Sequence, residues 1–285
     1  LIDAFVKALS SSAKELSAAA HYGDSMVIFI GGVDPRNNFP FLSVEPTCGG
    51  WGGFESSDGA DALINNVNGG FKDLPIEVFE SKYPVSIFNY GFRENSGGLG
   101  KSRGGLGLYR EYTINTDGFV SLWFERSVTP AWGLFGGKDG LPPNVNIKIP
   151  NEKETNLLKA NGLQIKKGTV LTTYTGGGGG FEEPLERDPE DVLKDVKNRY
   201  VTIEKAKEIG MDNTNFANSS AGHRAVYASY RRWSAAFAAL IAPSVILETP
   251  PGPIPIRNKP LESMQFSPSP SNQYPDWLRW VTCVI

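Results

Sequence analysis

The stretch Asn95-Ser-Gly-Gly-Leu-Gly-Lys-Ser102 decides how the chain around it folds. It lacks only a glycine at position 95 to match the phosphate-loop pattern GxxxxGK[ST], which joins a strand to the N-terminus of a helix. A β-prone run, Val85–Phe92, does precede it. Arg103-Gly-Gly-Leu-Gly107, however, places three more glycines where the first helical turn should be, and each costs about 1 kcal/mol relative to alanine in a helix. The stretch therefore predicts a turn between two strands. Lys101, Arg103 and Arg110 could still bind an anion, but solvated loop charges are the simpler interpretation.

The sequence on both sides of this turn reads mainly as strands. Leu108–Ile114 alternates between apolar and polar residues, as does Ile76–Glu80, and the latter places Glu77 and Glu80 on opposite faces of a strand. Further strands are expected at 25–30, 39–44, 119–125, 145–149 and 170–174. A helical pattern covers residues 1–20. The run of five glycines at 176–180 is typical of a flexible connector, although such a run also permits close approach to a ligand.

The chain changes character after residue 187. Asp188-Pro-Glu-Asp191 is typical of a helix start, and Thr202 is placed to cap a second short helix. The fold class is therefore α+β: strand-dominated, with glycine-rich loops, short C-terminal helices and a low-order tail. Residues 1–187 form the β-rich region and 188–212 a helical segment of the same domain. The Pro-rich remainder, 213–285, is expected to be poorly ordered apart from a helical pattern at 226–247.

Composition excludes several classes of protein. The chain has 285 residues, 40% of them hydrophobic, so it can form a sizeable core. Its net charge of −3 argues against nucleic-acid binding. It has two cysteines, Cys48 and Cys283, too few for a disulfide framework, which makes a reducing compartment, the cytoplasm, the expected location. With no signal peptide visible and no run of 18 apolar residues, no membrane partner is expected.

The residues that could carry chemistry are few. His21 and His223 have no second His or Cys at metal-ligand spacing, so no zinc site is indicated. His21 could serve as a general base, but a lone histidine near a helix end is more often structural. Asp58 and Asp61, three apart in a glycine-rich loop, could bind a cation or polarise a water; acids there more often cap turns. Taken alone, these residues describe only a soluble β-rich globular protein.

A series of glycine-rich motifs extends this description. In order along the chain these are Gly31-Gly-Val-Asp-Pro35, Cys48-Gly-Gly-Trp-Gly-Gly53 with Asp58-Gly-Ala-Asp61, Ser96–Gly105, Trp132-Gly-Leu-Phe-Gly-Gly137, Tyr174–Gly180 and Pro184-Leu-Glu-Arg-Asp-Pro189. Over about residues 1–210 the series resembles the C-terminal part of the B-type chain of the hydantoinase B / 5-oxoprolinase family, which is related to the large subunits of acetone and acetophenone carboxylases.

The resemblance implies a role in the ATP-dependent hydrolysis of cyclic amides of the hydantoin, N-methylhydantoin or 5-oxoproline type. ATP is expected on an A-type partner subunit or domain, and a divalent metal on an N-terminal half of the B-type chain that has no match here. Both cofactors therefore lie outside this chain, which should be inactive alone and part of a hetero-oligomer. Two alternatives stay open: a subunit of an ATP-dependent ketone carboxylase, which Gly69–Pro75 resembles weakly, and a non-catalytic interaction module.

The loop Cys48–Asp61 is the candidate for a shared active site. Gly50, Trp51 and Gly52 are the expected substrate or interface residues, and Asp58 and Asp61 are the catalytic candidates. The alternative for this loop is a cover over the core, with its acids capping turns.

Overall fold

The computed structural model describes residues 1–208 except 24, 66–67 and 69–70. Its architecture is two antiparallel sheets with a few short helices, so the predicted strand-dominated α+β class is confirmed. The predicted tail at 213–285, with its helical pattern at 226–247, lies outside the described residues.

The described elements are α1 (Ile2–Leu9), β1 (Val27–Val33), β2 (Pro40–Glu45), α2 (Ile76–Lys82), β3 (Val85–Phe92), β4 (Leu108–Ile114), β5 (Gly118–Trp123), β6 (Asn144–Lys148), β7 (Thr155–Asn156), β8 (Lys159–Ile165), β9 (Val170–Tyr174), α3 (Pro189–Lys197) and α4 (Ile203–Glu208), with 3-10 turns at Lys14–Leu16 and Pro184–Glu186.

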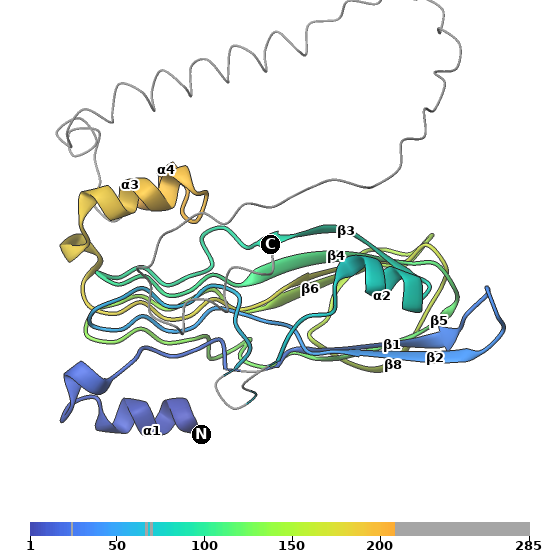
Figure 1. Ribbon diagram of the computed structural model, residues 1–285, viewed down its shortest axis with the longest axis horizontal. Helices are drawn as coiled ribbons and strands as arrows, with labels where there is room; N and C mark the ends of the chain where they lie inside the picture. Colours follow the sequence, from blue (N-terminus) through green and yellow to red (C-terminus); the bar gives the residue numbers. More distant parts are fainter. Residues whose placement is uncertain (24, 66–67, 69–70, 209–285) are drawn as a thin grey trace, which may run out of the picture. The chain divides into compact units, whose positions relative to one another are not determined.

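The strands divide between two sheets (Figure 1). The first sheet has the order β2-β1-β5-β8, and the second has the order β3-β4-β9-β6-β7. Alternate residues of each strand point into the space between the sheets, as the two-residue period of a strand requires. One hydrophobic core fills that space and draws on both sheets, with Ile28, Ile30 and Leu122 from the first and Tyr112, Val145 and Leu171 from the second.

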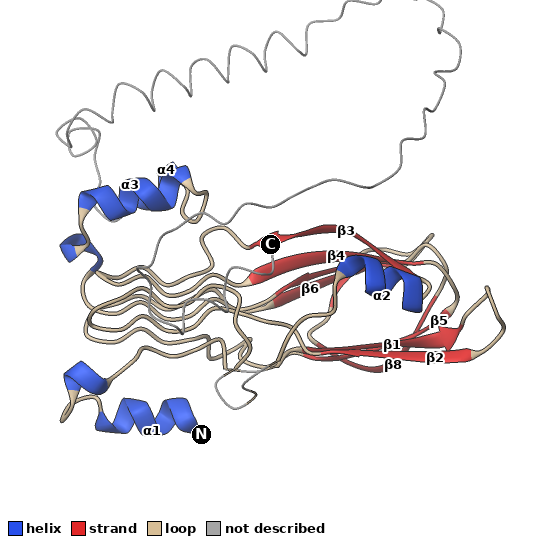
Figure 2. Ribbon diagram, in the orientation of Figure 1, coloured by secondary structure: helices blue, strands red, loops and turns tan. Residues whose placement is uncertain are grey.

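Beyond one end of the strands, the glycine-rich segments run side by side without regular sheet structure (Figure 2). The five-glycine run 176–180 lies among them and is fully buried, so its interpretation as a flexible connector was wrong. The N–H groups of four of these glycines donate to four different partners, Leu141, Gly105, Ala20 and Lys138 in turn. We call this arrangement the glycine bundle: the run 176–180 and the segments 18–22, 49–54, 96–107 and 131–141 around it.

The contacts of the central run repeat every three residues. A β-carbon on Gly177 would overlap the backbone of Ser96, and one on Gly180 would overlap Leu99 in the same neighbouring segment. Between them, Gly178 lies against Trp51 and Gly179 against Trp132. A three-residue period is that of a polyproline II helix, in which only glycine allows backbones to approach this closely on every side. The last four glycines of the run, 177–180, are thus each required by a close backbone neighbour.

The turn Asn95–Ser102 lies between β3 and β4, as the sequence predicted, and the chain after it is extended rather than helical. Two of its N–H groups bond to the central run or to the residue after it: Gly98 donates to Gly178 O (2.8 Å) and Ser102 to Phe181 O (3.1 Å). The expectation of solvated charges was wrong for two of the three cations. The Arg103 and Arg110 side chains are each only 4% exposed and paired with carboxylates. Arg110 occupies an inward-facing position of β4, and Arg103 is buried in the loop before that strand.

Two further expectations fail. Residues 76–82 form a helix rather than a strand, because Phe79 is buried against Tyr83 and Tyr112 and the helical register places it there. Glu77 and Glu80 are therefore on α2, where Glu80 accepts a bond from the Ile87 N–H (2.7 Å). Strands β7 and β8 were missed.

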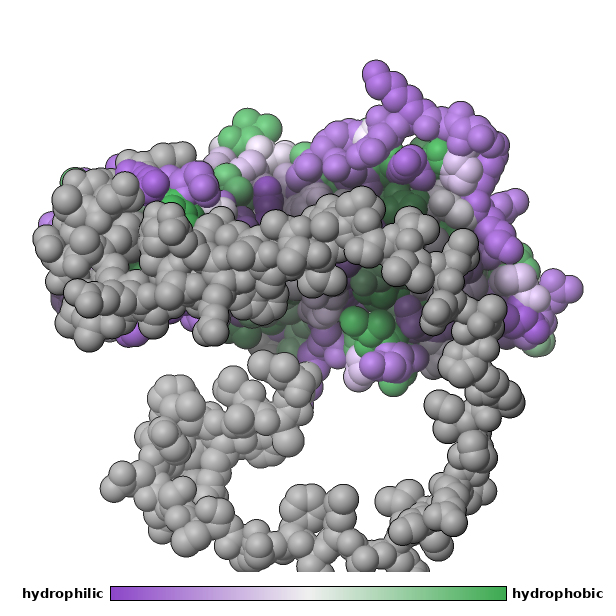
Figure 3. Space-filling model, turned by 90° about the horizontal axis from the view of Figure 1, so that it is seen from above, coloured by the Kyte–Doolittle hydropathy of each residue, from purple (hydrophilic) through white to green (hydrophobic). Residues whose placement is uncertain are grey.

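The C-terminal helices of the described part agree with their sequence signals. Asp188 caps α3 by accepting a hydrogen bond from the Glu190 N–H (2.8 Å), and Pro189 occupies the first helical turn. Thr202 Oγ1 accepts a bond from the Lys205 N–H (3.2 Å) at the start of α4. Seen from above, the right-hand margin of the described part is mostly hydrophilic (Figure 3). Among the described helices, none has both the length and the apolar composition that crossing a membrane requires.

Candidate functional site

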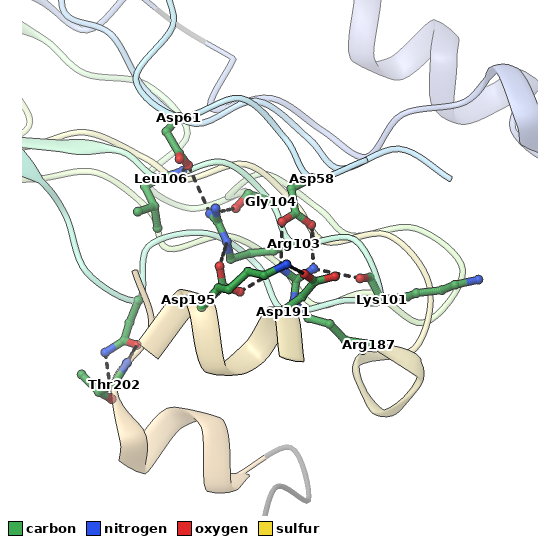
Figure 4. Close-up of polar contacts among 12 residues, drawn as sticks. Asp58, Asp61, Lys101, Arg103, Gly104, Leu106, Arg187, Asp191, Asp195 and Thr202 are labelled. Atoms are coloured by element: carbon green, nitrogen blue, oxygen red, sulfur yellow. Dashed lines mark hydrogen bonds and ion pairs between the residues drawn. The ribbon is translucent and has the colours of Figure 1, made fainter. Parts of the chain in front are cut away.

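The candidate acid Asp58 lies in a charged network that joins the glycine bundle to α3 (Figure 4). Its carboxylate accepts two hydrogen bonds from Arg187, at 2.6 and 2.7 Å, and a third from the backbone N–H of Arg103 at 2.7 Å. Arg187 also donates to Asp195 of α3 (2.9 Å) and to the carbonyl of Lys101 (2.9 Å). Asp58 therefore forms a bidentate ion pair with Arg187, and this pair holds α3 against the bundle.

Asp61 occupies the other end of the same network. Its Oδ1 accepts hydrogen bonds from the Leu106 N–H (2.7 Å) and from Arg103 (3.2 Å). Arg103 in turn lies 3.5 Å from Asp195 and stacks over the Tyr200 ring at 5.1 Å. The structure thus brings the two predicted acids together through arginines, and three carboxylates share two buried guanidinium groups.

The network changes the protonation of its carboxyl groups in opposite directions. Burial alone would raise the pKa of Asp58, but pairing with Arg187 outweighs burial and holds the pKa below its usual value. Burial raises the pKa of Asp195 despite the nearby Arg187 and Arg103. Because Asp58 is ionised and already accepts three hydrogen bonds, its geometry is that of a structural anchor more than of a free general base.

The other candidates in the loop are held by backbone packing. A β-carbon on Gly50 would overlap the carbonyl of Gly105, and one on Gly52 would overlap the carbonyl of Ala19. Trp51 donates its indole N–H to the Ile64 carbonyl (2.7 Å). These glycines are explained by chain-to-chain packing within the bundle, so they require no ligand to account for them.

His21 lies beside this loop. Its ring is 4.5 Å from the Trp51 ring, and its Nδ1 is buried without a hydrogen-bond partner, 3.8 Å from Asp3. Burial lowers the pKa of His21 below its usual value, against the opposing effect of Asp3. A neutral histidine packed on Trp51 between α1 and the bundle agrees with the structural interpretation of this residue.

A second buried network, which the sequence analysis missed, connects the two sheets. Arg110 of β4 pairs with Glu45 of β2 and with Asp73 (2.9 Å). Tyr112 donates to Glu45 (2.6 Å), and Tyr90 donates to Asp73 (2.7 Å). The signal was present in β4, since the alternation that buries Leu108 and Ile114 also places Arg110 and Tyr112 toward the core.

Cys48 lies close to this second network but is not a candidate nucleophile. Burial, reinforced by the charge of Asp73, raises the pKa of the Cys48 thiol to about 12. A thiol with that pKa is protonated at neutral pH, and the thiolate is the reactive form.

The donor groups present do not fit a metal ion or the phosphates of ATP. No three His, Cys, Asp or Glu side chains converge at metal-ligand spacing in the part of the chain that the structure describes. The acids of the candidate loop are neutralised by arginines, and the near phosphate loop has no helix after it.

Comparison with known proteins identifies relatives for most of the described chain. Residues 1–184 match the family model described as hydantoinase B/oxoprolinase. The chain is 31% identical over 209 residues to a putative B-type D-/L-hydantoinase chain of Pseudomonas sp. (strain NS671), covering 72% of this chain and 34% of the relative. It is 31% identical over 216 residues to the caprolactamase beta chain of Pseudomonas jessenii, covering 73% and 37%. The chain thus spans about a third of the length of these relatives.

Two solved structures share the fold. The ATP-dependent caprolactamase of Pseudomonas jessenii superposes with a TM-score of 0.61 at 26% identity, over 73% of this chain and 38% of that chain. A nucleotide-free acetone carboxylase superposes with a TM-score of 0.57 at 19% identity, over 76% of this chain and 34% of that chain, which shows likeness of fold alone.

Proposed function

The chain belongs to the hydantoinase B/oxoprolinase family, and we propose that it is part of the B-type chain of an ATP-dependent hydrolase that opens cyclic amides. The observation that carries the proposal is the match over residues 1–184 together with relatives named hydantoinase, 5-oxoprolinase and caprolactamase. All three names describe enzymes that act on a ring containing an amide bond. Hydantoin, 5-oxoproline and lactams are accordingly the proposed substrate class.

The role of the described residues within such an enzyme is that of a scaffold. The glycine bundle buries its central run, and the Asp58–Arg187–Asp195 network holds α3 on it. ATP and the divalent metal are assigned to other parts of the assembly, an A-type partner and the rest of a B-type chain. The site by which this chain would reach the shared active centre is the loop Cys48–Asp61, whose Glu55, Ser56 and Ser57 are exposed at its tip.

The ketone carboxylase alternative has less support. The likeness to acetone carboxylase is one of fold, whereas the likeness to caprolactamase extends to 31% sequence identity with its beta chain. We therefore keep amide hydrolysis as the proposed reaction.

A hybrid enzyme tests the proposal. The whole chain replaces the matching third of the Pseudomonas jessenii caprolactamase beta chain, and the hybrid is combined with the remainder of that enzyme. ATP consumption is then measured with caprolactam, hydantoin, 5-oxoproline, and acetone with bicarbonate, in turn. The proposal predicts ATP consumption that depends on at least one cyclic amide. An assembled hybrid that responds to acetone and bicarbonate but to no amide would overturn it.

A further inference from the structure

The first sheet carries an unusual outer face. Six large apolar side chains cluster on that face, and three of them are more than half exposed: Leu42 at 52%, Val44 at 52% and Trp123 at 58%. We call the set the apolar outer face; its members are Val27, Phe29, Leu42, Val44, Phe119 and Trp123. They alternate along their strands with core residues such as Ile28 and Leu122, so they point away from the core.

These side chains form one continuous surface across three strands. Phe29 is directly opposite Val44 in the register, and its ring lies 4.9 Å from that of Trp123. Gly31 lies between Leu42 and Phe119, and both of those side chains reach over it. The face is therefore a patch that spans β2, β1 and β5, not a scatter of single exposed residues.

The second sheet supplies an internal comparison. Its outward positions are mainly polar, with Glu111 and Thr113 on β4, Asn146 on β6 and Thr172 on β9. An antiparallel sheet with one face against a core and one face in water shows this alternation of apolar and polar residues. On β2, β1 and β5 the outward positions of the first sheet are instead mainly apolar, which is the pattern of a sheet covered on both sides.

The length of the relatives indicates what covers it. This chain corresponds to 34% of the hydantoinase relative, 37% of the caprolactamase beta chain and 38% of the caprolactamase chain of known structure. About two thirds of each relative therefore has no counterpart in this chain and is available to cover a face of the matched third. The described helix α2 packs on β3, which is a strand of the second sheet and not of the first.

We propose that the apolar outer face is the docking surface for the remaining two thirds of a B-type chain. The inference rests on the proposed function only in taking this protein as a part of such a chain. The occupant presents an apolar surface, because a polar one would lose its hydrogen bonds to water against Phe29 and Trp123. Trp123 is the expected centre of the interface, since tryptophan dominates binding energy where it becomes fully buried.

The test measures binding between the whole chain and the separately produced part of the Pseudomonas jessenii caprolactamase beta chain that lies outside its matched third. Trp123→Lys places a charge in the proposed interface. Thr172→Lys, on an outward position of the second sheet, is the matched control, and Val44→Lys is a second interface variant if Trp123→Lys alters the fold. Circular dichroism and the melting temperature of each protein alone check folding.

The proposal predicts that wild type and Thr172→Lys bind equally, whereas Trp123→Lys or Val44→Lys weakens binding about 30-fold or more. Absence of binding by wild type, or equal loss in the Thr172 variant, would overturn it. Self-association of wild type that Trp123→Lys abolishes would also overturn it, in favour of a second copy as the occupant. The binding assay uses neither ATP nor an amide, so it is independent of the activity assay. An assembled but inactive hybrid would therefore count against the proposed function and not against this interface.

Discussion

Gly178 lies so close to the peptide carbonyl of Trp51 that a β-carbon on Gly178 would overlap the Trp51 oxygen. The two residues are far apart in sequence, and the contact joins the centre of the glycine bundle to the candidate loop. Both partners at the contact are backbone, so neither can move aside by changing a rotamer.

The first prediction follows from that contact. Gly178→Ala should destabilise the fold by about 3 kcal/mol or more, since overpacking typically costs 1–3 kcal/mol even where side chains can adjust. Gly176→Ala is the matched control within the same run, because its β-carbon would meet its nearest neighbours at 3.4 Å, an ordinary contact distance. Thermal unfolding of both variants measures the difference. Equal melting temperatures for the two would show that the run is not packed as described.

The second prediction concerns Asp58 within the assembled enzyme. If Asp58 is an anchor for Arg187, then Asp58→Asn should lower the free energy of unfolding by about 1–3 kcal/mol, less than for a fully buried pair because the Asp58 side chain is 35% exposed. Asp191→Asn, which alters an exposed pair with Lys194, should have a much smaller effect, because water and salt screen exposed ion pairs. Turnover of the Asp58 variant should fall only as far as unfolding explains. A large loss of turnover with an unchanged melting temperature would instead assign Asp58 to the active site.

The third prediction concerns the network between the sheets. Arg110→Met leaves the buried Glu45 and Asp73 without their cation and should destabilise the chain by about 3–5 kcal/mol. Adding Glu45→Gln to that variant removes one of the two uncompensated charges and should recover part of the loss. Denaturant unfolding of the single and double variants gives the coupling between the residues. Strict additivity of the two substitutions would contradict a shared network.

The fourth prediction is a pH dependence that His21 confers. The pKa of His21 in the folded chain is below its usual value of about 6.5, so at pH values just below 6.5 the unfolded state binds more protons than the folded state. Stability should therefore decrease as the pH falls from about 7 through 6.5 toward the folded pKa. In His21→Gln this part of the pH dependence should disappear. The melting temperatures of the two proteins are compared between about pH 7.5 and 5. Identical pH profiles would show that His21 does not cause the pH dependence of stability.

The fifth prediction concerns Asn95–Ser102. The chain alone should hydrolyse no ATP, because the loop has no helix after it and Lys101 pairs with Glu182 at 3.0 Å. ATP turnover by the purified chain that Lys101→Ala abolishes would show that the near phosphate loop does bind nucleotide.

Local sequence signals were sufficient where local chemistry decides the structure. The glycines at 103–107 excluded a helix after the turn, and Asp188 with Pro189 marked the start of α3. Local sequence signals failed where contacts between residues far apart in the sequence determine the structure. Phe79 becomes helical because its partners in the core require it, and β8 carries few inward apolar residues, so its pattern is weak. The five-glycine run has no side chains from which its neighbours could be inferred.

The candidate site shows the same division. The sequence identified Asp58 and Asp61 as notable acids, and the structure places both in one network. Their partners Arg187 and Asp195 were not predicted, because they lie far along the chain from the candidate loop and only the packing of α3 brings them near.

The central claim is that the run 176–180 is the buried axis of a scaffold built from the glycine-rich segments. Native-state hydrogen exchange of the Gly177–Gly180 amides tests it most directly, since each of these N–H groups donates to another segment of the bundle. The account predicts that they exchange as slowly as the core strand β4, because exposing them requires the bundle to open. Exchange as fast as that of an exposed loop such as Glu55–Ser57 would contradict it and return the run to the role of a linker.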